Sequence, residues 1–582
     1  MRRINERTGQ VLLACLLSSI MPLSAADNPA ATAQAPQPSE IDQLKQMLAD
    51  QQRQINELRQ ALAQQQKKES DDNVSAAAGS AVLPKADPTP VSTFRNLGQV
   101  ASTTAMVPHA PAAFALPAAA LPQAASTANA ASSAKNPCEA DPDRTIPTFL
   151  RIGSVCIVPI GFMDLTPFWR DKNAGSGMGS NFGSVPFNNT ANGNLSEFRF
   201  SPQNSRIGFR VDGDWKGAHF IGYNEFDFNG TSGSNAIAVS NGAFVPRLRL
   251  FWADVRKGKV EFLAGQSWSM LTPNRNGISA LPGDLFYTQV IDINYMAGLT
   301  WTRQPGMRVL IHPNQNVTFG FSAEQPDQYG GGSAGGSGIT LPTALTGLAN
   351  TQLDIAQNVS AGQNILTQPT VTPDFIAKVA LDYSRVHFEV GGLESNFKTT
   401  GVSAPFTTHH TTQGAGLLVG LNVAVVKNFR LISTNFFSDG GGRYLFGQAP
   451  DLIVRADGSL STVKADGTID GFEATVKNTL FYAYYGGIYI GRNVTIDTNG
   501  KPVGYGYTGS PNSQNRAINE FTLGFNQTMW RNPRYGAINV MGQYEYLSRN
   551  PWFVATGNPK GTHDSTIYFN IRYTLPGAMP NF

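Results

Sequence analysis

The sequence predicts an all-β transmembrane antiparallel barrel of about 16 strands, preceded by an N-terminal periplasmic coiled-coil helix. Two observations predict the barrel: an export signal with no later apolar stretch long enough for a membrane helix, and a long region of alternating apolar and polar residues. Charged residues make up 15% of the 582 residues, whereas soluble domains carry about 25%. A net charge of +3 is too small to indicate a nucleic-acid partner.

Residues 1–26 have the layout of a secretory signal peptide. Arg2 and Arg3 form a basic start, an apolar run extends from Val11 to Leu23, and the small residues Ser24-Ala25-Ala26 follow. The apolar run is shorter than the roughly 18–20 residues that a membrane helix needs. We therefore expect export, with the mature chain in the cell outer membrane.

Removal of the signal would leave two cysteines, Cys138 and Cys156. The expected compartment is oxidising, so the pair predicts one disulfide, which would contribute about 3 kcal/mol by closing a short loop. Two free buried thiols are the alternative.

Residues 39–68 predict a coiled-coil helix that begins with Ser39 as its cap. Its seam positions recur three and four residues apart at Ile41, Leu44, Leu48, Gln51, Ile55, Leu58, Leu62 and Gln65. About four heptads with repeated Gln make a weak seam, so we expect the helices to be tethered to an oligomer, and Ile and Leu favour a trimer. A frayed helix is the alternative. Residues 70–137 are rich in Ala, Pro and Ser and predict a disordered linker.

Residues 145–582 predict the transmembrane barrel. Apolar and polar residues alternate in many segments, such as Arg206–Asp212, Tyr223–Phe228 and Thr566–Tyr573. Period two indicates strands, although a soluble sheet has the same period. Ionisable residues on one face and aromatic residues on the other, with no helical segment to cover the sheet, favour a closed barrel in lipid, where every strand edge is paired.

Roughly 430 residues at about 25–28 per strand and connection give about 16 strands, and about 14 or 18 would also fit. Tight turns are predicted at Asp212–Asp214, Arg256–Lys259 and Val426–Asn428. The Gly/Ser-rich stretch from Gln328 to Thr372 predicts a long external or infolded loop with a short helix around 346–359. A second long loop is predicted over 439–470.

The polar face of the barrel holds the candidate binding residues. Alternation points these cations into the lumen: Arg199, Arg206, Arg210, Arg247, Arg249, Lys378 and Arg385. Guanidinium groups in a pore attract anions and bind carboxylate or phosphate with two hydrogen bonds. Arg247 and Arg249 are the strongest candidates because no acid shares their short strand face. Other acids do face inward, so a neutral ladder of ion pairs that stiffens the wall is the alternative.

No catalytic, metal or cofactor site is predicted, and we do not expect an enzyme. The seven histidines are scattered and match no catalytic motif. The glycines at 330–332 lack the following Lys-Ser/Thr of a phosphate-binding loop.

Four motifs occur in order between Arg199 and Ser269: Arg199–Arg210, Glu225–Phe228, Arg247–Arg249 and Ala264–Ser269. Together they resemble the DcaP-like family of trimeric outer-membrane porins. The resemblance implies a homotrimer of 16-stranded barrels behind periplasmic coiled coils, and uptake of dicarboxylates. The long linker and the cysteine pair depart from the family pattern.

We therefore expect a porin for passive diffusion of small anionic solutes, surrounded by outer-membrane lipid. We expect the terminal Phe582 to serve as a signal for the barrel assembly machinery, although prolines interrupt the preceding strand. One alternative is a phosphate-selective porin. Another is an envelope tether whose coiled coil binds peptidoglycan or a protein partner.

Overall fold

The computed structural model describes residues 149–174, 176–230, 244–332, 336, 338–346, 365–366, 372–400, 407–532 and 534–576. The predicted signal peptide, coiled coil and linker lie outside these residues, and so does Cys138. Cys156 is 2% exposed and is disulfide-bonded. Among the helices that the structure describes, none is both long and apolar enough to cross a membrane.

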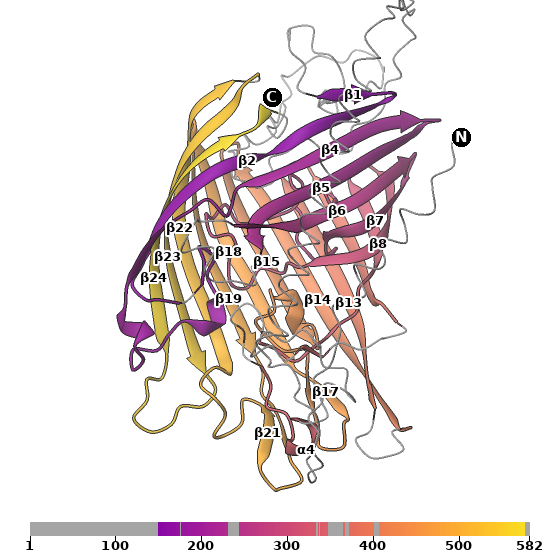
Figure 1. The fold of residues 1–582 in the computed structure, drawn as a ribbon. Coiled ribbons are helices and arrows are strands. Elements are labelled where there is room, and N and C mark those ends of the chain that lie inside the picture. Colours follow the sequence, from indigo (N-terminus) through magenta and orange to yellow (C-terminus); the bar gives the residue numbers. More distant parts are fainter. Residues whose placement is uncertain are drawn as a thin grey trace, which may run out of the picture. The chain divides into compact units, whose positions relative to one another are not determined.

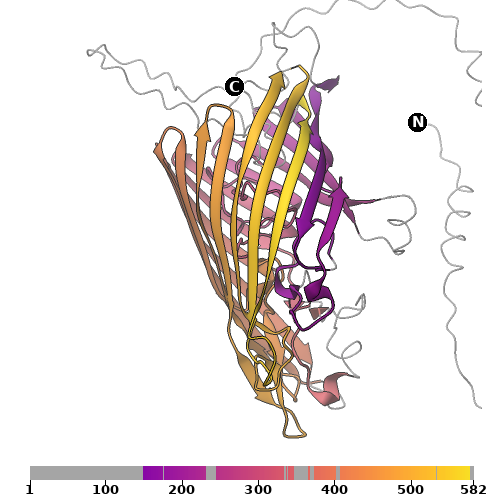
Figure 2. The same ribbon diagram turned by 90° about the vertical axis from the view of Figure 1, so that its left-hand side faces the viewer.

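Within the described ranges, 16 antiparallel strand positions close into a barrel, as predicted (Figures 1 and 2). In chain order the first eight are β2 (Val155–Arg170), β4 (Arg206–Trp215), β5 (Ala218–Gly230), β6 (Val245–Lys257), β7 (Val260–Trp268), β8 (Arg303–Asn314), β9 (Val317–Glu324) and β12 (Asp374–Tyr383). The second eight are β13 (Val386–Thr400), β14 (His409–Val426), β15 (Phe429–Asp439), β18 (Lys464–Val476), β19 (Thr479–Ile490), β22 (Asn515–Asn532), β23 (Gly536–Pro551) and β24 (Thr562–Thr574).

Strand β2 closes the barrel by pairing with β24 on one side and with β4 on the other. The short strand β3 (Glu197–Ser201) pairs with the C-terminal end of β2, and β4 pairs with the rest of it. β3 and β4 therefore lie end to end beside β2 and count as one strand position of the barrel. β1 (Leu150–Ile152) forms a small hairpin with the start of β2.

The last strand shows which face meets lipid. In β24 the apolar side chains of Ile567, Phe569 and Ile571 are 53%, 43% and 48% exposed, whereas the alternate residues Asn570 and Arg572 are buried. Apolar residues outside and polar residues inside reverse the order of a soluble protein, and this reversal is the signature of a transmembrane barrel.

Short turns connect the strands at one end, the upper end in Figure 1. The predicted turns at 256–259 and 426–428 are confirmed by the β6–β7 and β14–β15 hairpins. The turn predicted at Asp212–Asp214 is wrong, because these residues continue β4 and the turn is Lys216-Gly217. Both residues of that turn have positive φ, as a hairpin with a two-residue type I′ loop requires.

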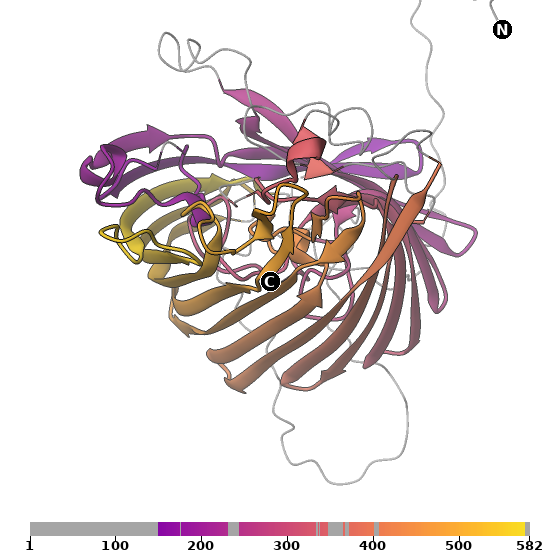
Figure 3. The same ribbon diagram turned by 90° about the horizontal axis from the view of Figure 1, so that it is seen from below.

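Longer connections fill the opposite end (Figure 3). The predicted loop over 328–372 contains β10 (Gln328–Tyr329), α4 (Thr343–Thr346) and β11 (Ile365–Leu366), and most of the helix predicted at 346–359 lies outside the described residues. The loop predicted over 439–470 is too long, since β18 begins at Lys464. Its other elements are η3 (Gly442–Tyr444), β16 (Leu452–Val454) and β17 (Leu460–Thr462).

The remaining short elements also belong to this end: η1 (Phe182–Ser184), η2 (Asn192–Asn194), β20 (Asn493–Ile496) and β21 (Pro502–Tyr505). Apolar residues from these connections pack inside the ring of strands. Phe182, Leu345 and Tyr444 belong to one buried cluster with lumen-facing residues such as Ile376 and Leu418. The connections are therefore held within the barrel by an apolar core.

Candidate functional site

The connection between β7 and β8, residues 269–302, folds into the lumen. Its two ends meet where the Ser269 amide donates to the Thr302 carbonyl at 2.9 Å. Asn276 is the only exposed residue of residues 269–302, all of which the structure describes. The sequence reasoning missed this segment and favoured residues 328–372 as the candidate for an infolded loop.

The infolded segment is bound to strands on several sides of the barrel. The Asn274 amide donates to Glu389 of β13 at 3.0 Å, and the Ala297 amide donates to Glu520 of β22 at 2.9 Å. On a third side, Arg275 forms two hydrogen bonds to Glu473 of β18. Because the segment is attached to several sides of the wall, it narrows the lumen at the height where it crosses the barrel.

Glycines allow the segment to lie directly on the wall. A Cβ atom on Gly298 would come within 2.3 Å of the Thr468 carbonyl oxygen, and one on Gly486 within 2.1 Å of the Ala297 carbonyl oxygen. These positions therefore accept no larger residue without displacement of the backbone.

Two carboxyl groups of the infolded segment have shifted pKa values because they are buried. Burial raises the pKa of Asp284 to about 6, while a hydrogen bond from Ser279 lowers it. Burial also raises the pKa of Asp292, which accepts hydrogen bonds from the Ser180 amide at 2.8 Å and from Tyr568 at 3.1 Å.

A β-bulge places Arg249 inside the barrel. The pairing of β5 with β6 shifts so that Leu250 faces Glu225 and Leu248 faces Phe226, which leaves Arg249 as the extra residue. Consequently the consecutive residues Arg249 and Leu250 both point inward and are 1% and 0% exposed. Bulges redirect side chains in this way.

Arg249 pairs with acids of the neighbouring strand β5. Its guanidinium donates to Glu225 at 2.7 Å, to Asp227 at 2.8 Å and to the Tyr295 hydroxyl at 3.4 Å. Arg247 donates twice to Asp227, at 3.0 and 2.6 Å, and its side chain keeps 31% exposure. Arg247 and Arg249 were the strongest candidates because no acid shares their own strand face. The adjacent strand nevertheless supplies acids that pair with both of them.

Arg206 and Arg210 extend the same row of cations along β4. Arg206 lies 3.4 Å from Glu225 and 3.5 Å from the Tyr295 hydroxyl. Arg210 donates twice to Asp212 of its own strand, at 2.7 and 2.6 Å.

Arg303, the first residue of β8, belongs to this group although the sequence reasoning did not select it. Arg303 and Arg249 both lie over the ring of Trp268, with guanidinium carbons 5.7 and 5.5 Å from its centroid. Among the described residues its side chain makes no hydrogen bond or ion pair, and its Nη1 atom is buried without a partner. We call Arg206, Arg210, Arg247, Arg249 and Arg303 the basic row.

The three other predicted cations lie away from the basic row. Arg199 is on β3, has 49% side-chain exposure and pairs with Glu197. Lys378 is buried on β12, where it binds Glu389 at 2.8 Å and the Thr272 carbonyl at 2.9 Å. Arg385 is exposed in the β12–β13 turn and donates to the Val425 carbonyl.

No protein-family model matches the sequence, and no curated protein matches it as a sequence relative. Solved structures do match. The outer-membrane channel DcaP of Acinetobacter baumannii aligns with a TM-score of 0.51 and 15% identity over 72% of this chain and 97% of that one. The chain has the fold of a DcaP-type outer-membrane channel. The resemblance inferred from the motifs is thus confirmed at the level of the fold.

Two other solved structures align less well with this barrel. OmpF of Salmonella typhi, in complex with daunomycin, gives a TM-score of 0.41 at 10% identity, covering 73% of this chain and 99% of that one. A trimer form of OmpT from Vibrio cholerae gives 0.36 at 11% identity, covering 72% and 99%.

Proposed function

We propose that the protein is an outer-membrane channel through which small anions, including dicarboxylates, diffuse passively. The observation that supports this most strongly is the charge of the basic row. Its five arginines face three acids, Asp212, Glu225 and Asp227, which leaves an excess of positive charge along one side of the lumen.

The exposure of the row supports contact with solutes. Arg247 and Arg303 are half-buried, whereas Arg206, Arg210 and Arg249 are buried and paired. The buried arginines hold the wall together through their ion pairs. The half-buried Arg247, which also binds Asp227, and Arg303 are the members of the row placed to donate to a passing carboxylate. Charged rings of this kind select ions by sign in other channels.

The proposal includes three copies of the chain joined in the outer membrane, with residues 39–68 as a periplasmic coiled coil. The heptad pattern supports a trimer, since a weak seam gains association energy when barrels hold the helices together.

The test is a reversal potential for the purified full-length protein in a planar bilayer with a potassium chloride gradient, repeated with potassium succinate. We expect the sign that corresponds to anion preference, and a current carried by succinate. Preference for potassium would contradict the proposal, and potassium phosphate in a third series would reveal a preference for phosphate over dicarboxylate.

A further inference from the structure

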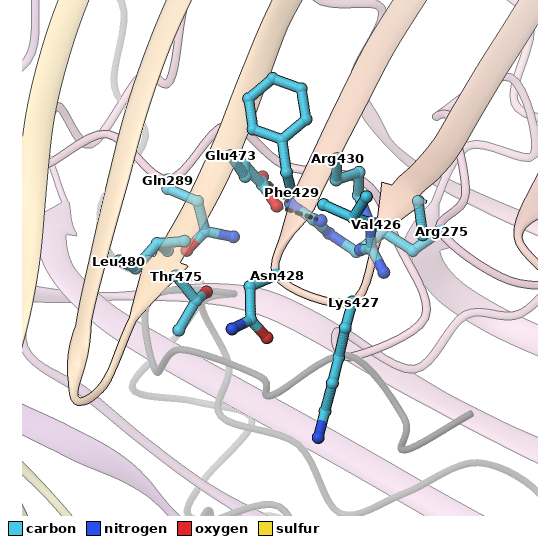
Figure 4. Close-up of a pocket in the computed structure, with 11 residues that line it drawn as sticks. Arg275, Gln289, Val426, Lys427, Asn428, Phe429, Arg430, Glu473, Thr475 and Leu480 are labelled. Atoms are coloured by element: carbon cyan, nitrogen blue, oxygen red, sulfur yellow. Dashed lines mark hydrogen bonds and ion pairs between the residues drawn. The ribbon is translucent and has the colours of Figure 1, made fainter. Parts of the chain in front are cut away.

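A second cationic pocket lies at the short-turn end of the lumen. It is lined by residues of the segment and of strands β14, β15, β18 and β19, including the β14–β15 turn (Figure 4). Three charged groups meet there: Arg275 from the segment, Arg430 from β15 and Glu473 from β18.

The pairing within this pocket leaves one guanidinium available. Arg430 is the direct cross-strand partner of Glu473. Glu473 nevertheless pairs with Arg275, which donates to both carboxylate oxygens at 2.6 and 2.9 Å. The Tyr484 hydroxyl also donates to Glu473, at 2.7 Å. In the part of the chain that the structure describes, the Arg430 side chain makes no hydrogen bond and no ion pair within 4 Å.

Neutral polar groups complete the lining. The Gln289 side chain is 2% exposed, and its Oε1 atom is buried without a hydrogen-bond partner. Gln289 and Thr475 lie across the pocket from the two arginines, whereas the Lys427 side chain extends away from it (Figure 4). The apolar side chains of Ala424 and Leu480 also face the pocket.

We propose that this pocket is a binding site for one carboxylate group of a small organic acid. Arg275 and Arg430 against Glu473 leave one positive charge, which a single carboxylate balances. Arg430 offers the planar pair of donors that a carboxylate accepts, and Gln289 can donate through its amide nitrogen. Ala424 and Leu480 are placed to contact a short hydrocarbon chain.

This inference rests on the proposed passage of anions and places a second binding site along their path. Its lining by the β14–β15 turn places the pocket at the short-turn end of the lumen, opposite the end that holds the long connections. A solute released from the basic row would therefore meet a second carboxylate site before leaving the lumen.

Calorimetric titration of the purified full-length protein in detergent tests the site, with succinate, butyrate and the neutral butyramide as probes. To separate the two sites, the titrations are repeated in an Arg247→Gln/Arg303→Gln background. We expect succinate and butyrate to bind with similar affinity and butyramide not to bind. Absence of carboxylate binding, or equal binding of butyramide, would overturn the site.

Substitution of Arg430 gives the sharper comparison. We expect Arg430→Gln to weaken butyrate binding by about tenfold or more, since it removes a charge-assisted contact, and Arg430→Lys to weaken it less. Glu473→Gln should strengthen binding because it removes the competing carboxylate. Lys259→Gln, an equal charge change in an exposed turn at the same end, is the control and should leave the affinity unchanged.

The two proposals fail in different ways. If Arg430→Gln binds butyrate like the wild type while the bilayer shows anion preference, the pocket is not a site and the channel function stands. If Arg430→Gln loses binding while the bilayer shows cation preference, the pocket binds carboxylates and the proposed function is wrong.

Discussion

The carboxylate of Glu389 joins Asn274 of the infolded segment to Lys378 of the barrel wall. It accepts the Asn274 amide at 3.0 Å and lies 2.8 Å from Lys378 Nζ, which in turn binds the Asn274 side chain at 2.9 Å. All three groups are buried. Lys378, selected from the sequence as a pore-lining cation, is thus placed to hold the segment that narrows the pore.

Replacement of Glu389 should release this part of the segment. In Glu389→Gln the buried Lys378 ammonium loses its only carboxylate within 4 Å among the described residues, and such a loss costs about 3–5 kcal/mol. We expect noisier single-channel currents and unfolding of the barrel at a lower temperature, followed by gel mobility. Glu394→Gln, an exposed change on the same strand, is the control. Equal behaviour of the two variants would show that this contact does not hold the segment.

A charge on the lipid-facing side of β24 should impede insertion. Phe569 is 43% exposed between the buried residues Tyr568 and Asn570. We expect Phe569→Arg to destabilise the barrel by about 2–4 kcal/mol, depending on depth in the bilayer. Folding into liposomes at increasing urea measures the difference, with Phe569→Leu as the control. Normal folding of the arginine variant would contradict the assignment of this face to lipid.

The infolded segment should respond to pH through Asp284. Burial raises its pKa to about 6, so the folded segment favours the protonated form. An acid whose pKa is raised on folding makes the folded form less stable as pH rises. The stability falls between the pKa of the unfolded chain, near 4, and the pKa of the folded segment, about 6, and it falls no further above that. We expect current noise to increase between about pH 4 and 6 and to change little above that.

Asp284→Asn should abolish this dependence and keep the quiet current at neutral pH. Ser279, Arg210, Glu261 and Asp382 also influence this carboxyl group, so each is left unchanged in the comparison. A pH profile that is the same in wild type and variant would exclude Asp284 as the titrating group.

The strands were predictable because their alternation extends over many residues. The run Thr566–Tyr573 lies within β24, and Phe569 and Asn570 point to opposite faces as period two requires. Counting by period two fails at a bulge, so the sequence could not show that Arg249 and Leu250 both face inward. It also could not show that Asp227 of β5 lies opposite Arg247, because that contact depends on strand register.

The infolded segment was missed because residues 269–302 have no period of either kind. One signal was present: Leu271, Ile291 and Met296 are apolar residues in a connection that would otherwise be exposed, and all three are buried. The Gly/Ser-rich stretch at 328–372 was more conspicuous in composition, yet composition does not report on burial. Arg303 was missed for a related reason, since it begins β8 two residues before Pro305 and outside any alternating run.

The central claim is that the basic row sets the preference for anions, and the reversal potential of an Arg247→Gln/Arg303→Gln double variant tests it most directly. These are the two half-buried arginines of the row, so their loss should remove accessible positive charge while the buried Arg206, Arg210 and Arg249 keep the wall intact. An Arg199→Gln/Arg385→Gln double variant is the matched control, because both residues are exposed and lie outside the row. In a tenfold potassium chloride gradient, we predict a reversal potential shifted toward the cation-selective side for the first variant and unchanged for the second. Equal reversal potentials for the wild type and both variants would contradict the account.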